Sequence, residues 1–216
     1  MYADWTAVIP VKRLSAAKSR LRGAVPEERH PELVLAMVRD TTAAVLSATS
    51  VAGLIVVTDD PVVSRAVREL GAEVAPDPGA GLNAALRFGA DEVAGPGTHR
   101  AVLTGDLPAL RPAQLDAALD GVRRRVFVPD AAGTGTVLRA APPGGPLGPR
   151  FGPRSATAHR ASGATARTGD WPGLRQDVDT AADLHTVLGL GAGEHTRAIL
   201  RDLGLSQACT PAACAG

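Results

Sequence analysis

The sequence of 216 residues contains few aromatic residues and almost no lysine. Phe, Trp and Tyr make up only 3% of it, too few for the aromatic platforms on which single-stranded nucleic acids stack. The 23 basic and 22 acidic residues nearly cancel, so no strongly basic surface is available to bind phosphate backbones. Of the basic residues only Lys12 and Lys18 are lysine, and all the others are arginine. We therefore expect no nucleic-acid partner.

Long apolar runs and cysteines are also scarce. No apolar stretch approaches the roughly 18 residues that a membrane span requires, and Asp4 and Pro10 in the N-terminal region argue against a signal peptide. A disulfide between Cys209 and Cys214 would close a very small loop and stabilise little. Without neighbouring histidines the two cysteines do not indicate a zinc site. These absences predict a cytoplasmic protein with no membrane partner and a disordered tail over residues 206–216.

Segments with strand character alternate along the chain with segments of helical apolar spacing. Short, buried strands are predicted at residues 5–11, 53–58, 73–75, 100–104 and 125–128. Helices are predicted after Pro26, Asp60, Gly81, Pro112 and Thr180, and a last helix ends near Leu203. This alternation predicts a single domain over residues 1–205, with a parallel sheet covered by helices on both faces. Residues 142–153 are too rich in proline and glycine for regular structure, and we expect a functional loop or lid there.

The loop after the first predicted strand is a candidate phosphate-binding site. Ligands of open α/β sheets bind at the carboxyl ends of the strands. The loop contains neither the Walker A motif nor the dinucleotide-binding glycine motif. Its basic residues are Lys12, Arg13, Lys18, Arg20 and Arg22. They form either a solvated basic loop or a phosphate site. We favour the second, because lysine is a compact point charge and this arginine-rich chain has its only two lysines here.

Three aspartates are candidate metal ligands. Asp106 follows the fourth predicted strand and is either a helix N-cap or a ligand; Pro112 places the next helix too late for capping. Asp177 and Asp179 alternate about one residue, so in an extended segment both would point to the same side. A cation such as Mg²⁺, which prefers oxygen ligands, would offset their repulsion. The alternative is a solvent-facing acidic edge.

Three glycine-rich segments are considered as anion sites. Residues 130–136 form a polar turn whose amides could contact an anion, although a hairpin turn is the simpler interpretation. Residues 151–155 place amides and a hydroxyl before a helix that carries His159, and His159 alone is interpreted as structural. Residues 189–193 lie between two predicted helices and are interpreted as a helix–helix turn.

Five segments, in this order and spacing, resemble the guanylyltransferases of deazaflavin coenzyme F-420 biosynthesis. They are residues 11–21, 105–110, 133–136, 150–159 and 177–180. The resemblance extends from about Trp5 to Leu203. It is greatest to the actinobacterial phosphoenolpyruvate guanylyltransferases, and next to the archaeal 2-phospho-L-lactate guanylyltransferases. It implies a three-layer nucleotidyltransferase (Rossmann-like) α/β fold with a mostly parallel central sheet, related to the molybdenum-cofactor guanylyltransferases.

The resemblance also implies a reaction. GTP and phosphoenolpyruvate would give enolpyruvyl-diphospho-5'-guanosine and diphosphate, and the product would pass to a downstream transferase carrying a deazaflavin. The same reaction on 2-phospho-L-lactate or 3-phosphoglycerate is an alternative. A sugar-phosphate or molybdopterin nucleotidyltransferase would share the fold but would have a glycine-rich first loop. A nucleotide-binding module without catalytic activity is the competing hypothesis from a different functional class.

The resemblance assigns site residues as well. Asp106, Asp177 and Asp179 lie where the family binds two Mg²⁺ ions. Thr136, Gly152 and Ser155 lie where it binds phosphoenolpyruvate. Analogy with the fold assigns the nucleotide to Lys12, Arg13, Lys18, Asp77, Gly81, Asn83 and Gly105. The expected catalytic residues are Lys12, Lys18 and Asp106, with the two lysines neutralising the triphosphate and the leaving diphosphate.

Overall fold

A computed structural model describes residues 4–16, 21 and 25–205 of the chain. The predictions for Lys18, Arg20 and Arg22 of the first loop, and for the tail over residues 206–216, concern residues outside this described part. None of the helices in the described part is long and apolar enough to cross a membrane.

The described strands form one sheet in the order β3-β2-β1-β4-β6-β5-β7. The strands are β1 (Trp5–Pro10), β2 (Val51–Val57), β3 (Glu73–Ala75), β4 (His99–Leu103), β5 (Val126–Pro129), β6 (Thr136–Ala141) and β7 (Thr165–Ala166). All neighbouring strands are parallel except β6, which is antiparallel to both β4 and β5. The prediction of a mostly parallel sheet is therefore confirmed, with β6 and β7 added to the five predicted strands.

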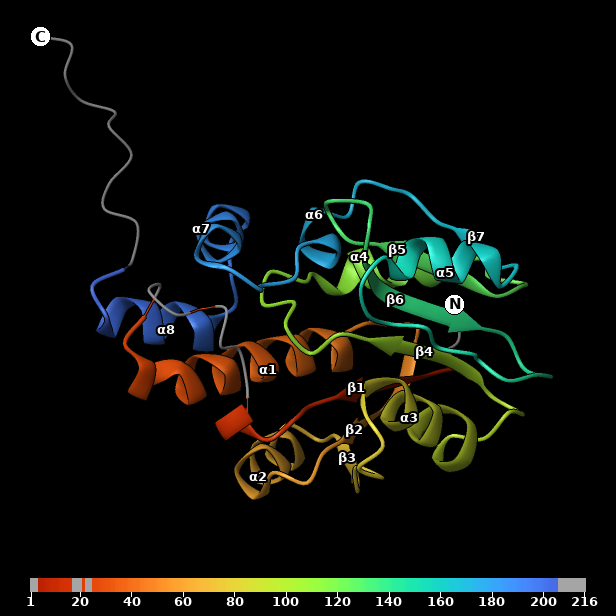
Figure 1. Cartoon of the computed structure of the whole chain (residues 1–216), viewed down its shortest axis with the longest axis horizontal. Coiled ribbons are helices and arrows are strands. Elements are labelled where there is room, and N and C mark those ends of the chain that lie inside the picture. Colours follow the sequence, from red (N-terminus) through yellow and green to blue (C-terminus); the bar gives the residue numbers. More distant parts are fainter. Residues whose placement is uncertain (1–3, 17–20, 22–24, 206–216) are drawn as a thin grey trace, which may run out of the picture.

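Helices cover both faces of this sheet, which gives the predicted three layers (Figure 1). The helices are α1 (His30–Leu46), α2 (Pro61–Glu69), α3 (Leu82–Arg87), α4 (Pro112–Leu119), α5 (Ser155–Ala161), α6 (Pro172–Arg175), α7 (Ala181–Leu190) and α8 (Glu194–Asp202). The larger core joins the sheet to α1, α2, α4, α7 and α8. A smaller core on the opposite face joins it to α3, and α5 covers Phe127 of β5. Figure 1 shows α1 and α8 lying side by side.

Local sequence signals fix several helix ends. Asp60 accepts hydrogen bonds from the N–H groups of Val62 and Val63, and Pro61 occupies the first turn of α2. Thr180 and Asp183 form a capping box at the start of α7. Gly191 ends α7 with a positive φ of 87°, and α8 begins three residues later. The predicted caps and the predicted helix–helix turn are thus confirmed.

Candidate active site

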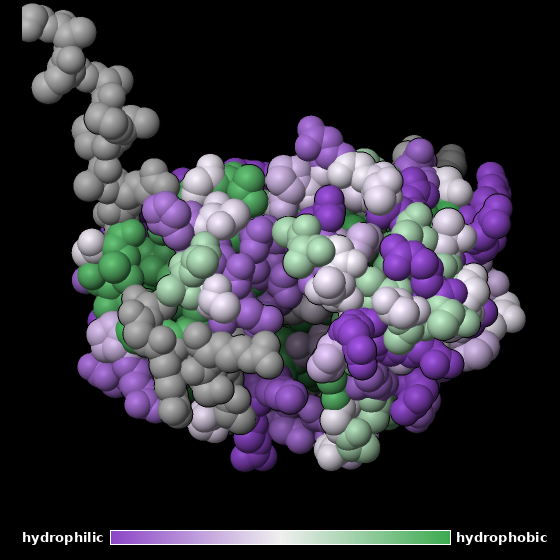
Figure 2. All heavy atoms as spheres, turned by 45° about the horizontal axis from the view of Figure 1, so that its top comes forward, coloured by the Kyte–Doolittle hydropathy of each residue, from purple (hydrophilic) through white to green (hydrophobic). Residues whose placement is uncertain are grey.

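A pocket of about 290 Å³ lies at the carboxyl ends of β1 and β4. Its apolar wall comes mainly from α1 and α3, with Phe151 beside them. The lining residues are Pro10, Val11, Lys12, Val34, Met37, Val38, Leu82, Leu86, Leu103, Thr104, Gly105, Asp106 and Phe151. Figure 2 shows a hollow with hydrophobic residues at its bottom and hydrophilic residues around it. The pocket lies at the sheet edge where parallel strands are expected to bind ligands.

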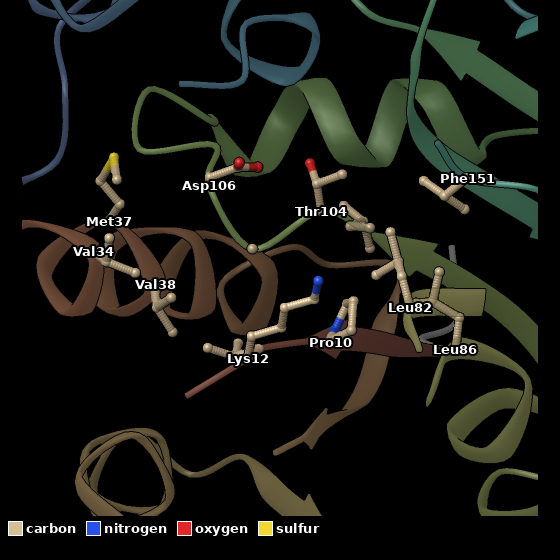
Figure 3. Close-up of a pocket in the computed structure, with 13 residues that line it drawn as sticks. Pro10, Lys12, Val34, Met37, Val38, Leu82, Leu86, Thr104, Asp106 and Phe151 are labelled. Atoms are coloured by element: carbon tan, nitrogen blue, oxygen red, sulfur yellow. The ribbon is translucent and has the colours of Figure 1, made fainter. Parts of the chain in front are cut away.

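Two lining residues have distinct effects on this pocket: Lys12 brings a positive charge to it, and Gly105 leaves room in it. Lys12 follows β1, and its ammonium group points into the pocket (Figure 3). A Cβ atom on Gly105 would lie 3.0 Å from Ile9 Cγ2, so the absence of a side chain lets the end of β4 approach β1. A cation therefore stands where two strand ends meet closely.

Asp60 anchors the loop that carries Lys12. Its buried carboxylate accepts a hydrogen bond from the Leu14 N–H at 2.9 Å, in addition to the two from the first turn of α2. Burial raises the pKa of Asp60, but these three N–H donors and the charge of exposed Arg13 outweigh it and hold the pKa below 3.8. The N-cap of α2 and the first residues after β1 are thereby one hydrogen-bonded unit.

The three aspartates predicted as metal ligands interact electrostatically. The Val178 N–H donates to the Asp106 carbonyl oxygen at 3.1 Å, and the Val178 side chain is buried. This hydrogen bond brings half-buried Asp177 and Asp179 to the end of β4. The pKa of Asp177 is raised to about 7, first by burial and then by the negative charges of Asp106 and Asp179.

The donor set fits a hard divalent cation. Among the described residues, no three His, Cys, Asp or Glu side chains form a cluster that could by itself hold a metal ion. Mg²⁺ usually takes one or two carboxylates and completes its shell with substrate phosphates and water. A half-buried carboxylate such as Asp177, whose pKa is raised by burial and by neighbouring negative charges, is a group that such a cation would stabilise in its ionised form.

The residues assigned to the acid lie around α5. Thr136, the first residue of β6, places its Oγ1 3.0 Å from Nδ1 of His159. Gly152 has a φ of 131°, a backbone conformation that side chains disfavour. Buried Ser155 begins α5 and donates its N–H to the Gly152 carbonyl oxygen at 3.1 Å. The start of β6, the turn before α5 and the first residue of α5 therefore supply the three residues of this assignment, and Thr136 contacts His159 directly.

Asn83 connects α3 to the segment before Gly152. Its amide nitrogen donates to the Phe151 carbonyl oxygen at 2.8 Å, and its amide oxygen accepts from the Phe151 N–H at 2.7 Å. The side chain thus holds the main chain at Phe151, a role that nothing in the local sequence could indicate. Its assignment to the nucleotide stays a prediction.

Sequence similarity to known proteins establishes the family. Residues 5–213 match the family model "Guanylyl transferase CofC like". The chain belongs to this family. It is 58% identical over 197 residues to the phosphoenolpyruvate guanylyltransferase of Salinispora arenicola, covering 89% of this chain and 91% of that one. It is 51% identical over 204 residues to the enzyme of the same name from Geodermatophilus obscurus, covering 91% and 94%.

Similarity to a solved structure shows the fold. A crystal structure from Desulfovibrio desulfuricans G20, described as a nucleotide-diphospho-sugar transferase, superposes with a TM-score of 0.69 at 17% identity. The match covers 94% of this chain and 95% of that one. The nucleotidyltransferase fold that the sequence predicts is thereby confirmed.

Two further residues predicted to bind the nucleotide contact the backbone of this CofC-like chain. The Asp77 carboxylate accepts from the Gly79 N–H at 2.9 Å, and the Asp77 N–H donates to the Asp59 carboxylate. Gly81, with a φ of 89°, is the N-cap of α3. They stand beside α3, which lines the pocket through Leu82 and Leu86. Their assignment to the nucleotide stays a prediction as well.

The hairpin interpretation of residues 130–136 is confirmed. The Asp130 carboxylate accepts from the N–H groups of Thr134 and Gly135 at 2.9 and 2.8 Å. The Asp130 carbonyl oxygen accepts from the Gly133 N–H at 3.1 Å. These amides close the turn between β5 and β6, so the alternative of an anion-binding loop is not favoured.

Sequence reasoning missed the apolar wall of the pocket. Val34, Met37 and Val38 of α1 line it, although their helical spacing predicts only a core-facing stripe. The same stripe packs on the sheet and faces the pocket, because the pocket lies at the edge of the core. Only the position of α1 relative to the end of β1 separates the two roles.

Proposed function

We propose that this chain is a phosphoenolpyruvate guanylyltransferase of coenzyme F-420 biosynthesis. It would join GTP and phosphoenolpyruvate into enolpyruvyl-diphospho-5'-guanosine and release diphosphate. The observation that supports the proposal is that Lys12 and Asp106 line one pocket, while the distant segment of Asp177 and Asp179 is hydrogen-bonded to Asp106 through Val178. Relatives that are 58% and 51% identical over most of the chain bear this name. A nucleotide-binding module would need no such set of carboxylates.

The chemistry requires positioning and charge neutralisation more than a reactive side chain. A phosphate oxygen of the acid would attack the α-phosphorus of GTP in line, and the bond to the diphosphate leaving group would break. The attacking oxygen is already anionic, so neither a protein nucleophile nor a general base is needed. Lys12, with Lys18, would neutralise the triphosphate and the leaving diphosphate. The main obstacle is the repulsion between two polyanions.

Asp106, Asp177 and Asp179 would hold Mg²⁺, with two ions as the expected number. Bound Mg²⁺ supplies Lewis-acid neutralisation of phosphate oxygens. The three side chains would fix where that charge stands relative to Lys12. Arg13, Asp77, Gly81, Asn83 and Gly105 would surround the nucleotide, and Thr136, Gly152 and Ser155 would bind the acid. The product would pass to a transferase carrying a deazaflavin.

The test of the substrate compares three acids. Purified protein is given GTP and Mg²⁺ with phosphoenolpyruvate, 2-phospho-L-lactate or 3-phosphoglycerate, and diphosphate release is measured. Coupling to the downstream transferase and its deazaflavin acceptor identifies each product by mass spectrometry. We expect phosphoenolpyruvate to be the preferred acid. Preference for either other acid would change the substrate, and release with none of them would contradict the proposal.

The test of the carboxylates uses Asp106→Asn and Asp179→Asn. Each change removes a negative charge from the proposed Mg²⁺ site with little change of volume, so diphosphate release should be abolished. Asp202→Asn, on the exposed face of α8, makes the same chemical change and should keep full activity. Full activity in either Asp106→Asn or Asp179→Asn would refute the metal assignment.

A further inference from the structure

His159 is enclosed on all sides and makes two hydrogen bonds. It is 0% exposed, with the rings of Phe127 and Phe151 at centroid distances of 5.6 and 5.4 Å. Its Nδ1 lies 3.0 Å from Thr136 Oγ1, and its Nε2 lies 2.9 Å from the main-chain nitrogen of Arg150. Each ring nitrogen therefore has one defined partner.

These partners determine which ring nitrogen carries the proton. A main-chain N–H can only donate, so the Arg150 N–H requires a lone pair on Nε2. Burial first, and then the charges of Arg139 on β6 and Arg150 in the loop, lower the pKa of His159 to about 4. Arg160 lies over the ring of Phe127, which also contacts His159. The ring is therefore neutral at physiological pH, with its single proton on Nδ1.

The Nδ1 proton in turn orients the Thr136 hydroxyl. Nδ1–H donates to Thr136 Oγ1, so the hydroxyl acts as acceptor toward His159 and its own proton must point elsewhere. Within the described part of the chain, that hydroxyl has no other hydrogen-bond partner. Thr136 is one of the residues assigned to the acid, and 6% of the surface of this residue is exposed. A directed O–H donor suits an anionic oxygen.

We propose that His159 is a positioning residue for the acid, holding the Thr136 hydroxyl as a donor toward a carboxylate or phosphate oxygen. The identity of this ligand rests on the proposed function. The same ring holds the Arg150 N–H while Asn83 holds both main-chain polar groups of Phe151. The main chain leading to Gly152 is therefore ordered before the acid binds, which lowers the entropic cost of binding.

The proton position is tested without any assay of activity. The full chain is labelled with ¹⁵N-histidine, long-range ¹H–¹⁵N correlation spectra are recorded at pH 5.5 to 8, and His159→Gln assigns the His159 signals among those of five histidines. We expect a neutral ring protonated on Nδ1 with no titration in this range. A proton on Nε2, or a titration midpoint near 6.5, would overturn the inference, even if the protein transfers guanylyl groups as proposed.

Two variants separate the two hydrogen bonds of the ring. His159→Asn keeps a donor near the position of Nδ1, whereas His159→Gln keeps an acceptor near the position of Nε2. Loss of a hydrogen bond that supports binding of an anion should raise KM for the acid about tenfold or more in His159→Gln. The rise should be smaller in His159→Asn, and neither variant should alter KM for GTP. His185→Gln, on the exposed face of α7, is the matched control.

Thr136 variants complete the test. Thr136→Val removes the hydroxyl at constant shape and should raise KM for the acid as much as His159→Gln, and Thr136→Ser should raise it less. The double variant of Thr136→Val and His159→Gln should be no worse than Thr136→Val alone, because both remove the same donor. Additive effects, a defect in His159→Asn as large as in His159→Gln, or an unchanged KM in His159→Gln would each overturn the inference. If a variant fails to fold, the spectrum of the unaltered chain still decides.

Discussion

Arg139 is a buried cation with incomplete hydrogen bonding. It stands in the middle of β6 and is 0% exposed. Its Nε donates to the Leu147 carbonyl oxygen at 2.9 Å, but Nη1 and Nη2 have no hydrogen-bond partner within the described part of the chain. Burial, followed by the charges of Arg125 and Arg150, lowers its pKa to about 10. A buried charge without a counterion destabilises the fold.

We therefore expect Arg139→Met to stabilise the protein. Replacing a poorly paired buried charge by an apolar side chain of similar length should raise the free energy of unfolding by about 1–3 kcal/mol. Arg100 is equally buried but pairs with Asp91 and the Gly145 carbonyl oxygen, so Arg100→Met should lower stability by about 3–5 kcal/mol. Urea unfolding measures both. A loss in Arg139→Met as large as that in Arg100→Met would contradict this account.

Single residues could be selected from the sequence as candidates where the signal was local. Lys12 stands out as one of two lysines, and Asp177 and Asp179 stand out by their alternation. The roles of Asn83 and His159 could not be predicted in this way. Asn83 bonds to a residue of the loop after β6, and His159 acts through Thr136, so both depend on tertiary packing.

At the scale of elements, the start of α2 also supports the loop after β1. Asp60 accepts three backbone N–H groups, and its pKa is held below 3.8. Because the folded pKa is below the unfolded one, the stabilisation is complete above pH 3.8 and is lost as the pH falls through the folded pKa.

Asp60→Asn should therefore lower stability by about 1–2 kcal/mol at neutral pH, because an amide is uncharged and has one oxygen, whereas Asp60 accepts from Leu14 on Oδ2 and from the first turn of α2 on Oδ1. The difference from the unaltered chain should shrink as the pH falls below 3.8. Urea unfolding of both proteins from pH 6 to pH 3 measures it. A difference that stays constant over this range would show that the charge of Asp60 is not the cause.

Most of the strands could be predicted from the sequence, but β6 and β7 could not. The five strands with an apolar run bounded by turns or helices were all predicted, within two residues at each end. β6 was not, although the hairpin turn before it was recognised. All six of its residues are buried, so it lacks the alternation of a half-exposed strand, and Arg139 interrupts its apolar run. β7 has only two residues, Thr165 and Ala166, too few to show any period.

At the scale of the whole molecule, ligands at one edge of the sheet should stabilise the complete fold. GTP with Mg²⁺, without the acid, should raise the free energy of unfolding by about 2.7 kcal/mol when the GTP concentration is about a hundred times its Kd. This corresponds to a rise in Tm of roughly 5–10 °C for a chain of this size.

Thermal unfolding with and without EDTA isolates the Mg²⁺-dependent part of that rise. It should disappear in Asp179→Asn and persist in Asp202→Asn. An equal Mg²⁺-dependent rise in Asp179→Asn and the unaltered chain would place the metal elsewhere.

The hydrogen bond between Val178 and Asp106 also has a consequence for the order of events during synthesis. It joins segments separated by α4, β5, β6, α5, β7 and α6, so the three carboxylates cannot meet until most of the chain has left the ribosome. Contacts between distant segments form late and slow folding. A nascent chain that stops before Asp177 would have the first loop and its lysines but no complete site. The enzyme would thus acquire its charge balance and its activity together, in the last stage of folding.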